Sequence, residues 1–379
     1  KLQNYNISLS EKTIWQFDSM KKIKQVHLIY PVGNKISTPD TIGRHLKEAL
    51  EKHYEVKTYR YNSFHIIKPG SADVLLGHWH PNPLTTFRMS ARLKGWQRIL
   101  PLAPFCPDPT GWHNAFAKTT IKYCDRYLAI TGNAWMNRVK RSPFQHWEPK
   151  LVHLDLAVDR MEFPLLKTKY NSPGKRKFLY IGHTAWCKNT EFLEELAKQL
   201  PNTHFSWAGF GRILKNVASL GVVDFSEKYA HNLLNEYDFL LMPSSSDANP
   251  TTILEAMAWG LIPLSSLQSG YEGFPSIRNL SIENLEEAVS TIENLQFIPE
   301  SKLKEWQKEN IKLLDQHFNW ERFCNQVLEE IETRSKPEIE NDNSSLNSFL
   351  KSAEKQSPYY WKKPRNLVSY LKTIFLDQF

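Results

Sequence analysis

The segment that begins at Asp238 carries the side chains best suited to chemistry in this sequence. An apolar strand, Phe-Leu-Leu-Met, is followed by a Pro-Ser-Ser-Ser loop and then by a helical pattern that ends at Gly260. Asn249 is the expected N-cap of this helix and Pro250 its first residue. The free backbone amides of the first helical turn can then bind an anion such as a diphosphate. The residues that we expect around this anion are Ser244, Ser245, Thr251 and Thr252.

Two carboxylates flank this expected phosphate site. Asp247 stands just before the helix and Glu255 lies within it. A phosphate does not attract carboxylates, so their useful partners are the hydroxyl groups of a sugar or a ribose. The structural alternative is an acid favoured by the helix dipole, with a solvated glutamate further on. Taken as a whole, the segment favours a site for a sugar nucleotide.

This segment resembles the signature of retaining glycosyltransferases of family 4, which have the GT-B fold. The shared pattern is a strand, a Pro-Ser loop, two acids separated by seven residues, and a Glu-Ala-Met-Ala-x-Gly end. The first acid is Asp247 here, where the family most often has glutamate. The resemblance implies that Glu255 holds the nucleotide ribose, that Asp247 faces the donor sugar and that the helix N-terminus takes the phosphates. It also implies two facing Rossmann-like, doubly wound α/β domains, with a C-terminal helix that returns to the N-terminal domain.

Further matches to the family follow in the same order along the chain. Residues 178–200 resemble its strand–glycine–lysine–helix element, in which two cations clamp the diphosphate. Lys188 matches the lysine, and His183 stands where arginine is usual, which makes that part of the clamp dependent on pH. The structural alternatives are a solvated lysine at a helix start and glycines that only make turns. The remaining donor-side residues implied by these matches are Gly182, Gly209, Gly211 and Val223.

The N-terminal half should hold the acceptor. His78 and His80 follow a strand, and as a His-x-His pair they lack a third metal ligand nearby, so we expect them to line the cleft. Asp108 and His113 lie in another strand-end loop, where the family places a His or Asp beside the transferred sugar; the alternative is that they only shape the loop. Thr131 resembles a residue at a cleft-lining strand end. We expect no metal and no cofactor besides the nucleotide-sugar substrate.

Strands alternate with helices in both halves of the chain, which predicts parallel α/β sheets. Among the expected elements are a basic helix near residues 87–100 and a short strand at 221–225. The predicted organisation is an N-terminal extension (1–20), an N-terminal Rossmann-like acceptor domain (21–166), a linker (167–177), a C-terminal Rossmann-like donor domain (178–304), C-terminal helices (305–335), a polar linker (336–357) and a basic aromatic tail (358–379).

Composition limits the class of protein. The chain has 379 residues, 41% of them hydrophobic and 23% charged, and a net charge of +8. These values indicate a globular protein of two domains whose partners are anionic: nucleotides, nucleic acid or a membrane surface. No apolar run is long enough for a membrane-spanning helix. The four cysteines lie far apart, which disfavours a zinc site or a disulfide framework and favours a reducing compartment.

The tail at residues 358–379 combines aromatic and basic side chains. It predicts either a helix that lies on a membrane surface or a helix docked on the N-terminal domain. The first alternative favours a lipid-linked or envelope polysaccharide acceptor. The expected location is the cytoplasm, with peripheral contact to the inner face of the membrane.

The leading hypothesis is a retaining, hexosyltransferase-like enzyme that moves a sugar from a UDP- or GDP-sugar to an acceptor hydroxyl, in cell-surface polysaccharide or glycolipid synthesis. The expected catalytic residues are Lys188, His183, Asp247, Asp108 and His113. Catalysis would rest on cations and helix amides at the leaving phosphate, with no carboxylate nucleophile. The departures at Asp247 and His183 leave a second hypothesis, a non-catalytic nucleotide-sugar-binding or scaffold protein of this fold. The third, and least favoured, is a nucleic-acid-binding protein.

Overall fold

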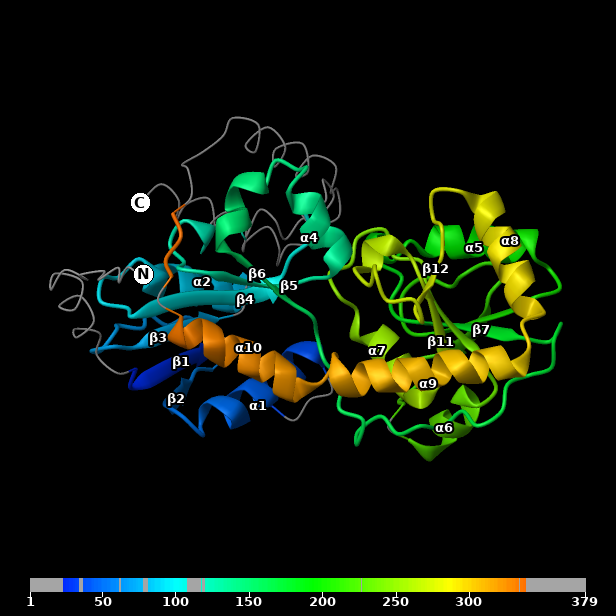
Figure 1. Ribbon diagram of the computed structural model, residues 1–379, viewed down its shortest axis with the longest axis horizontal. Helices are drawn as coiled ribbons and strands as arrows, with labels where there is room; N and C mark the ends of the chain where they lie inside the picture. Colours follow the sequence, from blue (N-terminus) through cyan, green and yellow to red (C-terminus); the bar gives the residue numbers. More distant parts are fainter. Residues whose placement is uncertain are drawn as a thin grey trace, which may run out of the picture.

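Two parallel β-sheets, one in each half of the chain, form the framework of the protein (Figure 1). The computed structural model describes residues 23–33, 37–60, 63–77, 81–107, 117, 120–225, 227–333 and 335–338. Each sheet has six strands, and every strand pair within them is parallel. This arrangement confirms the predicted fold class of two Rossmann-like α/β units.

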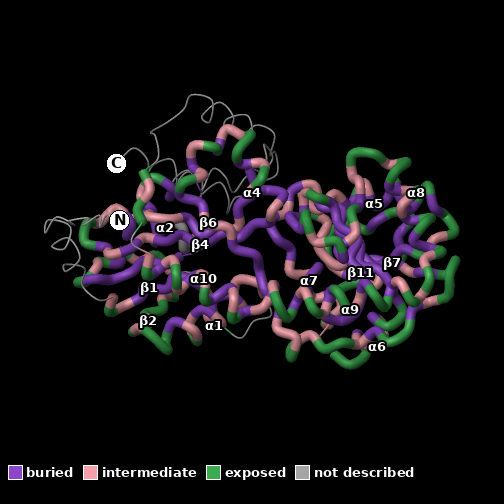
Figure 2. The backbone as a smooth tube through the Cα atoms, viewed as in Figure 1, coloured by how far each residue is buried: buried purple, intermediate pink, exposed green. Residues whose placement is uncertain are grey.

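The first sheet has the order β2-β1-β3-β4-β5-β6. Its strands are β1 (Gln25–Ile29), β2 (Glu55–Thr58), β3 (Val74–Gly77), β4 (Arg98–Pro104), β5 (Tyr127–Ile130) and β6 (Leu151–Leu154). The helices of this half are α1 (Thr38–Leu50), α2 (Pro81–Ala91), α4 (Asn133–Val139) and the short 3-10 helix Gln145–Lys150. Strands β3 and β5 are buried along their whole length, as expected of central parallel strands covered on both faces (Figure 2).

The second sheet has the order β12-β11-β10-β7-β8-β9. Its strands are β7 (Lys177–Ile181), β8 (His204–Ala208), β9 (Ala218–Gly221), β10 (Phe239–Met242), β11 (Ile262–Ser265) and β12 (Arg278–Asn279). Helices α5 (Thr190–Gln199), α6 (Lys228–Leu234), α7 (Thr251–Trp259) and α8 (Leu285–Gln296) belong to this half. The order of the strands along the chain reverses between β7 and β10, so the loops after these two strands lie side by side.

Two long helices return the chain from the second half to the first (Figure 1). Helix α9 (Glu300–Gln316) packs against α7, and α10 (Trp320–Glu332) packs against α1. The Trp320 ring stacks on His45 at 4.4 Å between centroids, and Arg98 Nη2 donates to Glu330 O at 3.1 Å. The predicted return of a C-terminal helix to the N-terminal half is therefore confirmed.

A carboxylate ties together the two places where the chain passes between the halves. Asp155 follows β6, and its Oδ2 lies 2.8 Å from Nε2 of His317, which stands between α9 and α10. Arg322 Nη2 donates to Asp155 O at 3.0 Å. Burial alone would raise the pKa of Asp155, but its hydrogen bonds with His153 and His317 hold that pKa at about 2. The carboxylate therefore stays charged at this junction.

Two of the expected elements were wrong. The basic helix expected near 87–100 ends at Ala91, because Gly95 adopts a φ of +116° and Arg98 begins strand β4. The Arg98 side chain is buried against the end of α10, a contact that the local pattern does not reveal. The strand expected at 221–225 lies earlier, as β9, because Gly221 adopts a φ of +72° and ends it.

The two halves touch closely beside α4. A Cβ atom added to Gly132, the N-cap of α4, would lie 1.6 Å from Gly270 O. Nearby, Trp135 Nε1 donates to Asp247 O at 2.7 Å, and Leu156 N donates to Asn249 Oδ1 at 2.8 Å. Backbone contact at Gly132 therefore sets how closely the second half can approach the first.

In the part of the chain that the structure covers, every helix is too short or too polar to cross a lipid bilayer.

The contact at Gly132 can be tested by the substitution Gly132→Ala, which adds a single methyl group. The residue has an ordinary φ of −117°, so without the contact Gly132→Ala would leave stability unchanged or raise it. We expect the variant instead to lower the free energy of unfolding by about 1–3 kcal/mol, the usual effect of overpacking. Urea denaturation of both proteins measures this difference, and an equal or higher stability of the variant would contradict the contact.

Candidate active site

The loops after β7 and β10 meet at the reversal of strand order in the second sheet. Ligands of open α/β sheets bind at such a point, beyond the carboxyl ends of the strands. The loop after β7 carries His183 and Lys188, and the loop after β10 carries Asp247. The fold thus brings together three of the residues that the sequence singled out.

Glycines let the first of these loops pack closely against its neighbour. A Cβ atom on Gly209 would lie 1.9 Å from Gly182 O, and one on Gly211 would lie 2.0 Å from Thr184 Oγ1. Gly182 and Gly211 also have positive φ angles of 153° and 129°. Tyr180 Oη donates to His183 O at 2.6 Å. These contacts fix the backbone of the loop; a donor-binding role of the glycines stays a prediction.

Lys188 and Asp247 form a direct ion pair at the centre of the site. Lys188 Nζ donates to Asp247 Oδ2, and the two side chains are only 15% and 20% exposed. Ser244 Oγ donates to the same carboxylate oxygen at 3.4 Å. Burial, the largest influence on the pKa of Lys188, lowers it, but the charge of Asp247 and the hydrogen bond to it together raise it above its usual value. Lys188 therefore keeps its positive charge although it is partly buried.

His183 provides a neutral imidazole rather than a second cation. Burial, followed by the charge of Lys188, lowers its pKa. Ala185 N donates to His183 Nδ1 at 3.2 Å, so in the neutral ring the proton lies on Nε2. At neutral pH this ring offers one hydrogen-bond donor where an arginine would offer a permanent charge.

The N-terminus of α7 lacks a capping side chain. The expected N-cap at Asn249 was wrong: Pro250 is the N-cap, and the side-chain oxygen Oδ1 of Asn249 instead accepts a hydrogen bond from Leu156 N of the other half. Tyr271 Oη donates to Pro250 O at 3.0 Å and steadies the turn. At Thr251 the helix start meets the start of α1, since Thr251 Oγ1 lies 3.3 Å from Thr38 Oγ1. Two helix N-termini, each with a partial positive charge, converge here.

Glu255 lies one turn further along α7 and is partly buried. Burial raises its pKa to about 7, although a hydrogen bond with Thr251 lowers it in part. Such a carboxyl group changes charge near neutral pH and can accept hydrogen bonds from hydroxyl groups once it is ionised.

The structure places the other expected residues as follows. Ser244 is buried against Asp247, and Ser245 is partly exposed with its amide 2.9 Å from Cys187 O. Thr252 is partly exposed, and Val223 lies beyond the end of β9. Thr131 is fully buried, and its hydroxyl has no hydrogen-bond partner among the described residues. His78, His80, Asp108 and His113 lie outside the described residues.

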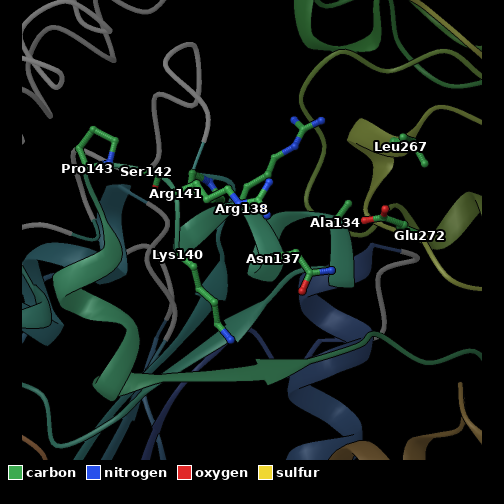
Figure 3. Close-up of a pocket in the computed structure, with 10 residues that line it drawn as sticks. Ala134, Asn137, Arg138, Lys140, Arg141, Ser142, Pro143, Leu267 and Glu272 are labelled. Carbon is green, nitrogen blue, oxygen red and sulfur yellow. The ribbon is translucent and has the colours of Figure 1, made fainter.

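A cavity of about 730 Å³ beside this site was missed by sequence reasoning (Figure 3). Its cations come from the end of α4 and the turn that follows. Leu267 and Glu272 of the second half lie across from Arg138, whereas the Lys140 side chain points away from them (Figure 3). The only signal in the sequence was three basic residues within four positions, which by itself is typical of a solvated surface. The lining residues that carry charge are Arg138, Lys140, Arg141 and Glu272.

Within the described ranges no group of three or more His, Cys, Asp or Glu side chains is placed to hold a metal ion. The expectation that the protein works without a metal or a cofactor stays a prediction.

The two sheets, their strand orders and the returning helix define the GT-B class of fold. No protein-family model matches the chain, and no curated protein matches it in sequence. Sucrose-phosphate synthase from Thermosynechococcus elongatus shares the fold with a TM-score of 0.61 and 12% identity, over 81% of this chain and 98% of that one. The catalytic domain of starch synthase IV from Arabidopsis thaliana, bound to ADP and acarbose, matches with a TM-score of 0.58 and 11% identity, over 83% of this chain and 99% of that one.

The lipopolysaccharide outer core galactosyltransferase WaaB also shares the fold. Its TM-score is 0.58 at 14% identity, over 81% of this chain and 99% of that one. The chain thus has the fold of nucleotide-sugar glycosyltransferases over most of its length. Likeness at such low identity shows the fold alone.

The raised pKa of Glu255 predicts a dependence of stability on pH. Between the usual value of 4.5 and about 7, the folded state keeps a proton that the unfolded state has released, so this group's contribution to stability falls as pH rises through that window. We expect the unfolding free energy to fall between about pH 5 and pH 8 by on the order of 1–3 kcal/mol more in the wild type than in Glu255→Gln.

Urea denaturation at the two pH values gives the comparison. Glu293→Gln is the matched control, because Glu293 is exposed on α8 and should leave the pH dependence as in the wild type. The same pH dependence in Glu255→Gln and in the wild type would contradict a raised pKa at Glu255.

Proposed function

We propose that this protein is a retaining glycosyltransferase, resembling those of family 4, that moves a sugar from a nucleotide diphosphate sugar to an acceptor hydroxyl. The observation that carries the proposal is the partly buried Lys188–Asp247 pair at the strand-order reversal of a GT-B fold, beside the uncapped start of α7. A cation and free helix amides suit a diphosphate, and a carboxylate beside them suits sugar hydroxyls.

Each residue then has a distinct role toward the donor. Lys188 and the amides of Thr251 and Thr252 bind the diphosphate. Asp247 accepts hydrogen bonds from the sugar, and Glu255 accepts them from the ribose. The donor is a UDP- or GDP-sugar, in keeping with the signature of the segment.

The proposed chemistry needs stabilisation of the leaving group more than a nucleophile on the protein. As the sugar–phosphate bond breaks, negative charge gathers on the departing diphosphate. Lys188 already carries its charge in a partly buried site, where it acts more strongly than in water. The Nε2–H of His183 can donate a further hydrogen bond to a phosphate or sugar oxygen. The acceptor hydroxyl attacks the anomeric carbon from the face that the diphosphate leaves and gives its proton to the departing diphosphate, so the anomeric configuration is retained.

We propose an acceptor that belongs to the cell surface. A cell-surface polysaccharide or a glycolipid fits a fold that is shared with a lipopolysaccharide galactosyltransferase. The proposed contact with a membrane surface would come from residues 358–379, which lie outside the described residues, and with it a location at the cytoplasmic face.

The second candidate is a non-catalytic protein that binds nucleotide sugars. It is favoured by one observation, the neutral His183 where the family has a permanent cation. Binding of a donor without any turnover would favour this candidate over the enzyme.

The role of Lys188 predicts a loss of activity in a single variant. We expect Lys188→Ala to lower the rate of nucleotide-sugar hydrolysis by about 100- to 1,000-fold, the usual effect of removing one group that stabilises a leaving oxyanion. The assay follows release of the nucleoside diphosphate. Lys198→Ala, at an exposed position near the end of α5, is the matched control and should keep the wild-type rate. Equal rates in the two variants would refute the role of Lys188.

The donor class can be found by thermal shift. We expect UDP or GDP, and sugars of the same base, to raise the melting temperature, with ADP as the comparison, because a ligand stabilises the folded state in proportion to ln(1 + [L]/Kd). Glu255→Ala should lose most of this stabilisation, whereas Glu293→Ala should keep it. The proposal fails if no nucleotide stabilises the wild type.

A further inference from the structure

We propose that the cavity beside α4 is an acceptor subsite for an anionic saccharide, one that carries a phosphate or a carboxylate group. The inference rests on the proposed function and names the chemical class of its second substrate. Three cations and one carboxylate line the cavity: Arg138, Lys140, Arg141 and Glu272.

Among the residues that the structure describes, the cations of the cavity have few charged partners. The guanidinium of Arg138 lies 4.9 Å from the centre of the Trp135 ring, a contact that leaves its hydrogen-bond donors available. Arg141 is exposed, and among the described residues no carboxylate forms an ion pair with it or with Arg138. Lys140 Nζ lies 3.6 Å from Glu148 Oε1, but both side chains are largely exposed and such a pair contributes little.

The cavity lies next to the donor site. Trp135, on which Arg138 rests, donates its indole N–H to Asp247 O at 2.7 Å, and Asp247 in turn holds Lys188. On the opposite wall, Leu267 is adjacent in sequence to Gln268, whose carbonyl oxygen accepts from Asp247 N at 3.0 Å. A molecule in the cavity would therefore touch both halves of the chain, and its walls lie next to Trp135 and Gln268, the residues that hold the loop proposed to bind the donor sugar.

The size and the chemistry of the cavity favour a small anionic sugar. A volume of about 730 Å³ lies in the range of pockets for small organic ligands. Arginine side chains bind phosphate and carboxylate through two parallel hydrogen bonds, which gives direction as well as charge. The single carboxylate, Glu272, and the amide of Asn137 can hold sugar hydroxyls.

Binding of defined sugars tests the subsite. We would titrate the protein with glucose 6-phosphate, glucuronate and glucose by isothermal titration calorimetry. The expected result is that at least one of the two anionic sugars binds about 10-fold more tightly than glucose, as one charge-assisted contact allows. Comparing glucose 6-phosphate with glucuronate shows whether the cavity prefers a phosphate or a carboxylate group. Equal affinities for all three sugars would overturn the proposal.

Matched double variants connect the preference to this cavity. Arg138→Gln with Arg141→Gln should abolish the preference for the anionic sugar. Lys308→Gln with Lys312→Gln removes the same charge from exposed positions of α9 and should keep it. If the Arg138/Arg141 double variant keeps the preference for the anionic sugar, that sugar binds elsewhere and the proposal is overturned.

Two further binding experiments test whether the anionic sugar enters the donor site instead and whether the cavity prefers nucleic acid. Saturating nucleoside diphosphate should leave binding of the anionic sugar in place, because an acceptor and a donor must bind together. Full competition would place the sugar phosphate in the donor site and overturn the subsite. Tighter binding of a single-stranded DNA oligonucleotide than of either anionic sugar, lost in the Arg138/Arg141 variant, would assign the cavity to nucleic acid instead.

The outcome is separate from that of the proposed function. If no nucleotide sugar binds the wild type, the proposed glycosyltransferase fails, whatever the anionic sugars do. If nucleotide sugars bind but no anionic sugar is preferred, only the acceptor subsite fails.

Discussion

The position of one short loop, between β10 and α7, governs the rest of the site. Asp247 in this loop is held from three sides: by the side chain of Lys188, by the indole of Trp135 and by the carbonyl of Gln268. The first and third contacts come from the second half of the chain, and the indole comes from the first half. The same loop therefore shapes the centre of the candidate active site and joins the two halves.

The charge balance of the site follows from this arrangement. Burial by itself would favour a neutral lysine, but the adjacent carboxylate keeps Lys188 protonated. This partly buried, paired cation is the group that we propose to bind the diphosphate of the donor. The converging starts of α1 and α7 add partial positive charge without adding another titratable group. His183 stays neutral in this field because burial and Lys188 both oppose its protonation.

Much of the fold and part of the site could be predicted from local sequence signals. The parallel sheets follow from alternating strands and helices, and Gly260 ends α7 as predicted, with a φ of +94°. The resemblance to family 4 singles out Lys188 and Asp247 as candidate site residues, and the fold brings the two into contact. Such features depend on residues close by in the chain or on a pattern that a whole family of folds repeats.

The tertiary structure alone decided the features that depend on contacts between distant segments. Asn249 has the side chain of a good N-cap, yet its side-chain oxygen Oδ1 accepts a hydrogen bond from Leu156 N of the other half. The basic residues near Arg98 suggested a helix, yet that arginine is buried in a strand against α10. The charge state of His183 and the cavity beside α4 likewise depend on burial and on surfaces from both halves. A sequence determines which side chains are present and how they are spaced. Packing decides which of these side chains become buried and which come into contact.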